Sequence, residues 1–403
     1  MLFIYHIAIR FYYLFVYAAS LFNQKAAQWI KGRKNMQLQQ SKNCIWFHFA
    51  SLGEFEQGRP VLEKLKTVYP DKPVVITFFS PSGYQIRKNT PLADAVYYLP
   101  LDTAFNARNF INTLQPAMAI FTKYEYWYHF FNELHQRQVP LYIISGIFRP
   151  GQVFFKWYGG LHRKMLTMVS HFFVQDDISR QLLQTLNINN VTVSGDTRFD
   201  RVWANAQQPK QLAEIAKFKA GQNIFIGGST WPQDEELLAG LVDNYPDWKF
   251  IFAPHEIGEE KISKLLGYLP AGQTIRFSSI AQLTNAHRVL VIDNIGMLSS
   301  LYQYAEVAYI GGGFGAGIHN TLEAAAFGLP VIFGPNYQKF KEAKDLMGLK
   351  AGISISDREQ LKQAAALLMN NAAHRAFAGE QSKKYVAGHI GATKAIVQYI
   401  TRQ

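Results

Sequence analysis

The chain contains a single cysteine, Cys44, so no disulfide can form within one molecule. No group of cysteine and histidine residues has the spacing of a zinc site. No D-x-D pair, H-E-x-x-H motif or carboxylate cluster indicates a divalent-metal site, and neither a G-x-S-x-G elbow nor a Walker loop occurs. The sequence therefore predicts a reducing, cytoplasmic setting with no metal or other cofactor, and it disfavours hydrolase and phosphoryl-transfer chemistry.

Charged residues are sparse, at 17% against 48% apolar residues, which indicates a globular chain, and 403 residues are enough for two domains. The positive charge is uneven. Residues 1–205 hold 22 Lys and Arg against 12 Asp and Glu, a net +10, whereas residues 206–403 hold 19 against 17, a net +2. Such an excess fits nucleic acid, anionic lipid or an anionic substrate, and charge alone does not separate them.

An uninterrupted apolar run of the roughly 20 residues that span a bilayer is also absent. The first 22 residues are strongly apolar and aromatic, but His6 and Arg10 interrupt them, and basic residues without an acidic one follow through position 34. The pattern favours a helix lying in the interface of the inner leaflet, with its basic tail on anionic headgroups, rather than a nucleic-acid binder. The alternative is a terminal helix packed on the core. A signal peptide is disfavoured because no small-x-small cleavage site precedes the polar stretch.

Short apolar runs alternate with segments of helical periodicity along the rest of the chain, which predicts parallel sheets covered on both faces. In the first half the expected strands are 45–49, 74–79, 95–99, 117–121, 141–145 and 172–174. The expected helices there are 55–68, 104–114, 128–137 and 178–186. In the second half the expected strands are 223–226, 249–254, 289–292, 307–310 and 331–333.

A polar stretch near residues 205–210 separates the two patterns. The fold class is therefore α/β, with two tandem, doubly wound, Rossmann-like domains facing across a cleft between the carboxyl edges of their sheets. The predicted parts are the anchor helix with its basic tail (1–35), the first domain (36–205), a linker (206–211), the second domain (212–385) and a C-terminal helix that can cross back to the first domain (386–403).

The segment 306–342 is the most informative one. It is typical of an apolar strand, a glycine-rich turn, a helix opening at His319-Asn320 with Glu323 in its first turn, and a second buried strand. Glycines let the backbone approach a phosphate, a helix N-terminus attracts it, and a carboxylate one turn in can accept from ribose hydroxyls. The segment also fits the G-x-G-x-x-A fingerprint of dinucleotide folds, but its helix starts too late. A plain strand-to-helix turn is the remaining alternative.

Two carboxylates follow predicted strands of the first domain. Glu54 sits where the first strand meets its helix, at the carboxyl edge of the sheet, and is suited to accept a proton from a substrate hydroxyl. Glu125 occupies the equivalent position after the strand 117–121, and the pair indicates an acceptor site. The structural alternatives are a helix-capping role for Glu54 and a buried pairing of Glu125 with Lys123 or Arg149.

In the second domain, Ser229 and Thr230 follow the first strand, so their backbone N–H groups and hydroxyls can face a phosphate or carboxylate. His255 closes the next strand and can place an imidazole on a leaving group. Asn320 and Glu323 complete this donor half. Individually these are ordinary loop residues, but together they line one edge.

Five segments resemble, in order and spacing, the Kdo transferases, which add 3-deoxy-D-manno-octulosonic acid (Kdo) to the lipid A precursor. They are FHFASLGEFEQGRPVLEKLK, TFFSPSGYQIR, KYEYWY, GSTWPQDEE and GGGFGAGIHNTLEAAAFGLPVIFGPNYQKFKEA. The resemblance covers nearly the whole chain. It implies a GT-B, metal-independent, inverting glycosyltransferase of lipopolysaccharide biosynthesis at the cytoplasmic face of the inner membrane. The implied partners are CMP-Kdo as donor, the lipid A precursor (lipid IVA) as acceptor and an anionic membrane surface.

The resemblance also assigns residues. Glu54 matches the catalytic base, within an S-x-G-E segment that places Ser51 and Gly53 on the acceptor side, and Glu125 matches a second acceptor-side acid. The residues matched to the donor side are Ser229, Thr230, Gly313, Gly315, Asn320, Glu323 on the ribose, and Glu342 after a G-P turn.

Three positions depart from the family pattern. His255 stands where many members have an arginine that offsets the charge of the CMP phosphate, Arg149 is displaced from the family's N-A-R-L-type segment, and Arg198 replaces a usual lysine. The basic, aromatic-rich first domain suits a bisphosphorylated glycolipid, with residues 154–158 and 162–164 as an interfacial patch or, alternatively, a helix packed on the core. The other functions that the residues leave open are a nucleotide-sugar epimerase or other GT-B enzyme, and a non-enzymatic membrane or polyanion binder.

Overall fold

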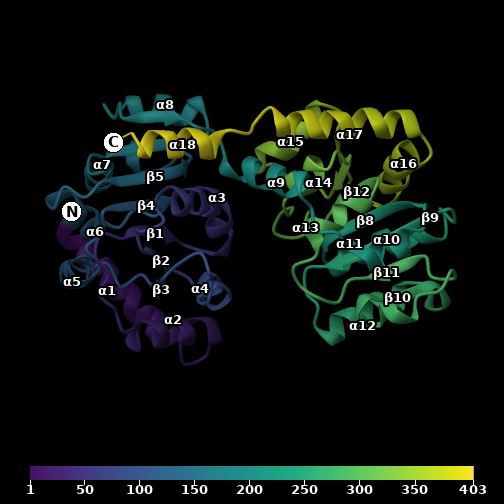
Figure 1. Cartoon of the computed structure of the whole chain (residues 1–403), viewed down its shortest axis with the longest axis horizontal. Helices are drawn as coiled ribbons and strands as arrows, with labels where there is room; N and C mark the ends of the chain where they lie inside the picture. The colour runs from purple at the N-terminus through teal and green to yellow at the C-terminus, as the bar shows by residue number, and fades with distance from the viewer. Residues whose placement is uncertain (403) are drawn as a thin grey trace. The chain divides into compact units, whose positions relative to one another are not determined.

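The structure, a computed structural model, describes residues 1–402 and divides into two compact units. Unit 1 contains Met1–Asp200 together with the segment from Ile390 onward, and unit 2 contains Arg201–His389. The domain boundaries expected from the sequence remain predictions, because contacts between residues do not establish which segments fold independently. Figure 1 shows the elements of each unit.

Unit 1 is built on a seven-stranded sheet in the order β3-β2-β1-β4-β5-β6-β7, and every neighbouring pair is parallel. Its strands are β1 (Ile45–Phe49), β2 (Val74–Phe78), β3 (Ala95–Tyr98), β4 (Met118–Thr122), β5 (Leu141–Gly146), β6 (His171–Val174) and β7 (Val191–Val193). The alternation of apolar runs with helical segments thus predicted the sheet class correctly.

Unit 2 has a second seven-stranded parallel sheet, in the order β10-β11-β9-β8-β12-β13-β14. Its strands are β8 (Asn223–Thr230), β9 (Trp248–Pro254), β10 (Thr274–Arg276), β11 (Val289–Val291), β12 (Val307–Ile310), β13 (Val331–Phe333) and β14 (Gly352–Ser354). The sequence did not predict β7, β10 or β14. Each is a three-residue strand at a sheet edge, where pairing on one side only demands less apolar burial.

Helices connect the strands. In unit 1 they are α1 (Leu2–Ala19), α2 (Gln24–Lys34), α3 (Leu52–Val68), α4 (Pro81–Arg87), α5 (Ala104–Leu114), α6 (Tyr128–Gln136), α7 (Gly160–Leu166), α8 (Asp177–Gln184) and α18 (Ala392–Ile400), while α9 (Thr197–Gln207) spans the division between the units. In unit 2 they are α10 (Ala213–Lys219), α11 (Pro232–Val242), α12 (Glu259–Tyr268), α13 (Leu298–Leu301), α14 (Leu322–Ala326), α15 (Lys341–Gly348), α16 (Arg358–Met369) and α17 (Ala372–Ala387). Short 3-10 turns are η1 (Val153–Phe155), η2 (Ala271–Gln273), η3 (Phe277–Gln282) and η4 (Tyr302–Tyr304).

The two faces of the first sheet carry separate cores because successive residues of a strand point to opposite faces. Phe47 and Phe49 of β1 pack with residues of α3 and α18, whereas Trp46 packs with α5 and α6. All five residues of β1 are buried, as expected for a central strand of a parallel sheet that is covered on both sides.

The C-terminal helix α18 belongs to unit 1, and Figure 1 shows it beside α3. Its apolar face, with Ile396 and Ile400, completes the core on that side of the sheet. The carboxylate of Asp200 binds its first turn, accepting from Gly391 N at 2.6 Å, Thr393 N at 2.8 Å and the Thr393 hydroxyl at 2.9 Å. One distant side chain thereby satisfies backbone donors that a helix N-terminus leaves unpaired.

The N-terminal helix α1 rests on unit 1 by one stripe only. Tyr5 donates to the buried carboxylate of Asp102, which also accepts from the first backbone N–H groups of α6, and His6 contacts His129 at 2.9 Å between their Nε2 atoms. The helix has a mean hydropathy of 1.5, is long and apolar enough to cross a membrane by composition, and is only 6% buried. A helix that is apolar on every side but packed along one stripe leaves a large apolar face uncovered.

The basic tail forms a helix of its own, α2, and one of its charges is not free for a headgroup. The guanidinium of Arg33 donates to the carbonyl oxygens of Leu99 and Phe79, both at 2.8 Å, and lies over the ring of Trp29 at 3.7 Å. Burial lowers the pKa of Arg33 to about 9. The sequence assigned this residue to the membrane surface, but it instead fixes α2 to the carboxyl ends of β2 and β3.

We expect Asp200→Ala to loosen α18, because the substitution removes every side-chain acceptor from the first turn of the helix. Removal of an N-terminal capping acceptor costs about 1–2 kcal/mol. Hydrogen exchange of the α18 amides should therefore accelerate by about 5- to 30-fold. Asp200→Asn, which keeps one acceptor oxygen, is the matched control and should show a smaller change. Unchanged exchange in Asp200→Ala would show that apolar packing alone holds α18.

Candidate active site

In each sheet the direction in which successive strands are added reverses once. The reversal lies between β1 and β4 in unit 1 and between β8 and β12 in unit 2. Open α/β sheets bind ligands beyond the carboxyl ends of the strands at such switch points. Glu54 follows β1 and Glu125 follows β4, while Ser229 lies in the carboxyl end of β8 and the glycine-rich turn follows β12. The motifs chosen from the sequence therefore lie at the two switch points.

Glu54 lies in the first turn of α3 and is half-buried. Its Oε2 accepts from the backbone N–H of Ala50 at 2.5 Å, so the capping role considered from the sequence exists. Burial and the charge of Glu125 raise the pKa of Glu54 to about 7, although the N–H groups of Ala50 and Ser51 and the charge of Lys123 act to lower it. The carboxyl group is thus poised between its two protonation states near neutral pH.

Glu125 is held by a hydrogen-bonded chain that crosses three strands. Its Oε2 lies 3.0 Å from His48 Nε2 and accepts from Trp127 Nε1, also at 3.0 Å. His48 Nδ1 lies 2.8 Å from the hydroxyl oxygen of Thr77, which accepts from the indole N–H of Trp46 at 2.9 Å. The Thr77 hydroxyl lies closer to His48 Nδ1 than to the carbonyl oxygen of Phe47, at 3.3 Å. If the hydroxyl donates to Nδ1, the His48 proton is on Nε2 and is donated to Glu125. The chain delivers two donors to one carboxylate oxygen.

Tyr124 lies within electrostatic range of both Glu54 and Arg149. Burial raises the pKa of its phenol, the charges of Glu54 and Asp176 raise it further, and Arg149 lowers it. Arg149 is exposed, on the loop after β5, and its charge acts on Tyr124. Unit 1 thus brings three of its expected residues together.

Ser51 and Gly53 precede Glu54 in the chain. Ser51 is the extended N-cap residue of α3 and makes no side-chain capping bond, and Gly53 is exposed, with only the Ser51 hydroxyl oxygen within 4 Å of an added Cβ. Gly53 therefore leaves open space at the start of α3.

In unit 2 a buried carboxylate organises the glycine-rich turn. Asp234, in the first turn of α11, accepts from the backbone N–H of Trp231 at 2.9 Å, the backbone N–H of Gly312 at 2.9 Å and the hydroxyl of Tyr309 at 2.7 Å. Gly312 has φ of +91°, and a Cβ on Gly313 would lie 2.6 Å from the backbone of Gly334. The turn requires glycine at both positions because of conformation and close approach.

Three rings form a stack beside that turn. The rings of Trp231 and His255 lie 4.9 Å apart, those of His255 and His319 lie 4.5 Å apart, and Trp231 Nε1 donates to His319 Nε2 at 3.0 Å. Burial, with the charge of His255, lowers the pKa of His319 to about 4, so Nε2 is free of a proton near pH 7 and accepts. His255 is exposed, so its imidazole can meet a ligand.

A cavity of about 480 Å³ lies between the first turn of α11 and the glycine-rich turn. This volume falls within the roughly 300–1,000 Å³ of small-molecule sites. Its lining includes Trp231, Asp234, Gly312, Phe314, Gly315 and His319. Gly315 was predicted here, whereas Trp231, Asp234 and His319 were given no role from the sequence.

The remaining donor-side residues are mostly tied into local structure. Thr230 is buried and donates to Glu235 at 3.0 Å, and Ser229 adopts a left-handed φ of +52° at an irregularity of β8. The amide of Asn320 donates to Glu323 at 3.2 Å and its oxygen accepts from Leu322 N at 3.1 Å.

The helix expected after the glycine-rich turn is shorter than the sequence indicated. It begins at Leu322 and spans five residues, so its dipole is small, although Glu323 does lie in its first turn as expected. Glu342 is buried in the first turn of α15.

His48 and Asp234 are the functional candidates that the sequence reasoning missed. His48 is the one ionisable residue in the strand sequence IWFHF, and Asp234 lies in the segment GSTWPQDEE. For His48, a lone polar residue in a buried strand was the available signal. Within residues 1–402 no group of three or more His, Cys, Asp or Glu side chains is arranged to hold a metal ion.

The two-unit architecture is shared with solved structures of low sequence identity. The UDP-GlcNAc 2-epimerase from Neisseria meningitidis bound to UDP-GlcNAc superposes with a TM-score of 0.64 at 14% identity, covering 89% of this chain and 100% of that one. The Acinetobacter baumannii MurG structure gives 0.55 at 13% identity, covering 90% and 100%. Such similarity shows the fold, which is of the GT-B class.

The curated sequence relatives all carry the same name. The 3-deoxy-D-manno-octulosonic acid transferase of Haemophilus influenzae is 26% identical over 371 residues, covering 88% of this chain and 86% of the relative. That of Rickettsia bellii is 26% identical, covering 90% and 89%, and that of Chlamydia muridarum is 25% identical, covering 85% and 82%. The family model described as 3-deoxy-D-manno-octulosonic-acid transferase (kdotransferase) matches residues 24–201. Over most of its length the chain is therefore similar to Kdo transferases, which are glycosyltransferases.

Proposed function

We propose that this protein transfers Kdo from CMP-Kdo to the lipid A precursor, lipid IVA, in lipopolysaccharide biosynthesis, with inversion at the anomeric carbon. The observation that carries the proposal is the environment of Glu54 in a chain similar to Kdo transferases. A general base works best when its pKa is near the working pH, and Glu54 has a pKa of about 7 at the switch point of the first sheet.

In the proposed reaction the ionised carboxylate of Glu54 takes the proton of an acceptor hydroxyl as its oxygen attacks the anomeric carbon of Kdo. The bond from that carbon to the phosphate oxygen breaks, and CMP leaves with the electron pair. One displacement from the face opposite the leaving group inverts the configuration. Glu125 acts by its charge: held in place by His48 and Trp127, it raises the pKa of Glu54.

Unit 2 supplies the groups for a nucleotide in this proposal. The backbone of the glycine-rich turn lines the cavity beside Trp231. Ser229, at the switch point, is assigned to the donor, and Glu323 is assigned to the ribose. His255 is the group assigned to the leaving phosphate in place of the arginine of many relatives. Glu342, buried in α15, is assigned a supporting role.

We further propose that α1 lies in the interface of the inner membrane, on its cytoplasmic side. Phe3, Phe11 and Phe15 are 74%, 66% and 75% exposed, and a fully apolar surface of this kind is costly in water. Trp157 is 89% exposed in the turn before α7, and Met1 Sδ lies near Gly160 of that helix, so both apolar features lie at one region of unit 1. Lys25 and Lys34 of α2 remain exposed for anionic headgroups.

Mass spectrometry of the purified enzyme incubated with CMP-Kdo and lipid IVA tests the assignment directly. We expect a product heavier by one or more Kdo residues together with release of CMP. A nucleotide-sugar epimerase would instead convert a UDP-sugar without a lipid acceptor, and a simple membrane binder would release no CMP.

We expect Glu54→Gln to lower kcat by about 10²–10⁴-fold while the affinity for CMP-Kdo stays within about twofold, because the amide cannot accept the proton. Isothermal titration and a CMP-release assay measure the two quantities. Glu63→Gln, further along the same helix, is the matched control and should retain full activity. Wild-type rates in Glu54→Gln would remove Glu54 from the mechanism.

The same variant should be more stable than the wild type at pH 8. The folded protein holds the Glu54 proton more tightly than the unfolded chain does, so stability falls as pH rises from about 4.5 to about 7. The amide introduced by Glu54→Gln cannot ionise and avoids this loss, which is about 3 kcal/mol at pH 8. Urea unfolding at pH 5 and pH 8 measures the difference, and an equal effect at both values would show that burial does not disfavour the ionised carboxyl.

The pH profile should also depend on Glu125. In the wild type, kcat/KM should rise with pH and level off above about 7, because only ionised Glu54 is a base. Glu125→Gln removes the like charge that raises the Glu54 pKa, so the midpoint should move to lower pH even where the maximum rate is reduced. A midpoint that stays in place would mean that burial alone sets the pKa.

We expect Phe11→Ser with Phe15→Ser to weaken sedimentation with anionic vesicles by about tenfold or more, since each buried phenylalanine contributes about 1.5–3 kcal/mol. The control is Ile295→Ser, which changes an 86% exposed apolar residue of unit 2. Equal vesicle binding by all the proteins would contradict the interfacial position of α1.

A further inference from the structure

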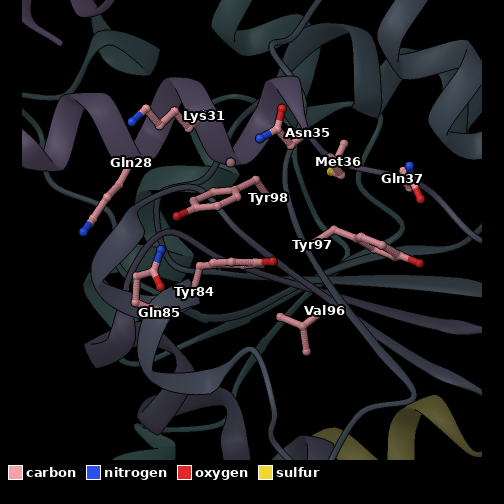
Figure 2. A pocket seen from close by; sticks show the side chains of 11 residues that line it. Gln28, Lys31, Asn35, Met36, Gln37, Tyr84, Gln85, Val96, Tyr97 and Tyr98 are labelled. Carbon is pink, nitrogen blue, oxygen red and sulfur yellow. The ribbon is translucent and has the colours of Figure 1, made fainter. Parts of the chain in front are cut away.

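A second cavity lies in unit 1, away from the carboxylate cluster, between α2, α4 and the edge strand β3. Its volume is about 430 Å³, and none of the cluster residues Glu54, Glu125 and Arg149 lines it. Figure 2 shows the side chains around it. They are Gln28, Lys31, Asn35 and Met36 from the region of α2, Gln37 after it, Tyr84 and Gln85 from α4, and Val96, Tyr97 and Tyr98 from β3.

Aromatic rings form one wall of this cavity. Tyr84 and Tyr98 stack with centroids 4.1 Å apart and planes inclined by 26°, whereas the ring of Tyr97 points away from them. Tyr97 is already engaged, because its hydroxyl oxygen accepts from Gln39 N at 3.1 Å. Rings offer a flat, polarisable surface to the C–H face of a ligand while their hydroxyls reach polar groups.

The hydroxyl of Tyr98 is the most informative atom of the cavity. Tyr98 is 1% exposed, and its oxygen has no hydrogen-bond partner. The amide of Gln85 lies near enough to lower the pKa of the phenol against the raising effect of burial, but it does not satisfy the hydroxyl. Leaving a buried polar group unpaired costs about 1–3 kcal/mol, so a fold that retains it on a cavity wall is expected to gain from a ligand. Figure 2 shows this hydroxyl pointing to the side where Gln28 and Gln85 lie.

The other polar groups define the ligand. The side-chain amides of Gln28, Asn35, Gln37 and Gln85 each present both donors and an acceptor, the pattern that neighbouring hydroxyls require. Lys31 is the one charged residue of the lining, and within residues 1–402 no ion-pair partner faces it. Amides, an aromatic wall and one cation together fit a ring with several hydroxyls and one negative charge.

We propose that this cavity is a binding site for an acidic saccharide, such as a phosphorylated, sulfated or carboxylated hexose, separate from the transfer reaction. The Tyr84–Tyr98 stack faces the sugar ring, the Tyr98 hydroxyl and the amides bind its hydroxyls, and Lys31 binds its acidic group. The same chemistry is presented by a soluble sugar and by the headgroup of a membrane glycolipid. Because α2 directly follows α1, either source reaches the site if α1 lies on a membrane.

The test uses the full-length protein and glucose 6-phosphate, with glucose and inorganic phosphate as partial ligands. Binding is measured by isothermal titration. We expect glucose 6-phosphate to bind more tightly than either fragment. Tyr98→Phe should weaken it by about 2- to 12-fold, the effect of one neutral hydrogen bond, and Lys31→Gln should weaken it by about tenfold and remove its salt dependence.

Matched variants separate binding from folding. Tyr98→Phe deletes an unsatisfied buried hydroxyl, so a purely structural role predicts equal or higher thermal stability, and a loss of affinity cannot then be attributed to unfolding. Lys25→Gln, on the same helix but outside the cavity, should bind glucose 6-phosphate as the wild type does. The proposal is overturned if the wild type binds glucose 6-phosphate no better than phosphate, or if Tyr98→Phe and Lys31→Gln both bind as tightly as the wild type.

A vesicle arm identifies the source. Phosphatidylcholine vesicles containing sulfatide are compared with phosphatidylcholine vesicles containing phosphatidylserine at the same charge density. Because α1 binds both kinds of vesicle, the difference in binding excludes its contribution. A preference for sulfatide that Tyr98→Phe abolishes assigns the site to a glycolipid headgroup. Equal binding to both vesicles, with glucose 6-phosphate binding retained, assigns it to a soluble saccharide. Absence of both signals overturns the proposal.

Discussion

The candidate acceptor site depends on the hydrogen bonds of the buried His48 imidazole. It joins β1 to Thr77 of β2 on one side and to Glu125, after β4, on the other, and these three strands are neighbours in the sheet. A buried polar group needs a hydrogen-bond partner, and the chain from Trp46 to Glu125 supplies one at every step. A charge fixed in this way has a defined effect on its neighbour, which is how Glu125 reaches Glu54.

Unit 2 uses the same device with a different residue. The carboxylate of Asp234 gathers a backbone N–H from each side of the switch point, so it holds the loop after β8 against the turn after β12. In both units a buried polar group is placed at the carboxyl edge of a parallel sheet and orders the loops that carry exposed candidates. The rest of each sheet supplies rigidity through apolar side chains.

The sequence predicted the parts of this arrangement that depend on local pattern. Central strands such as β1 and β12 are continuous apolar runs, and the positions of Glu54 and Glu125 follow from strand ends. The partners of His48 could not be predicted, because they lie 29 and 77 residues away and depend on strand order. The charge that residues 1–205 present to a ligand could not be predicted either. Arg33 contributes to the count but is bound to carbonyl oxygens inside the fold, so the number of basic residues overstates the charge available to a ligand.

The position of α18 has a consequence for biosynthesis. Ribosomes release the chain from its N-terminus, and domains generally fold as units during synthesis. The core of unit 1 includes Ile396, Val397 and Ile400, whereas unit 2 is contiguous in the chain. The first sheet therefore emerges early but waits, with one face incompletely covered, until all of unit 2 has been made. During that interval the nascent chain exposes apolar surface, and chaperones or the membrane itself are the agents that can cover it.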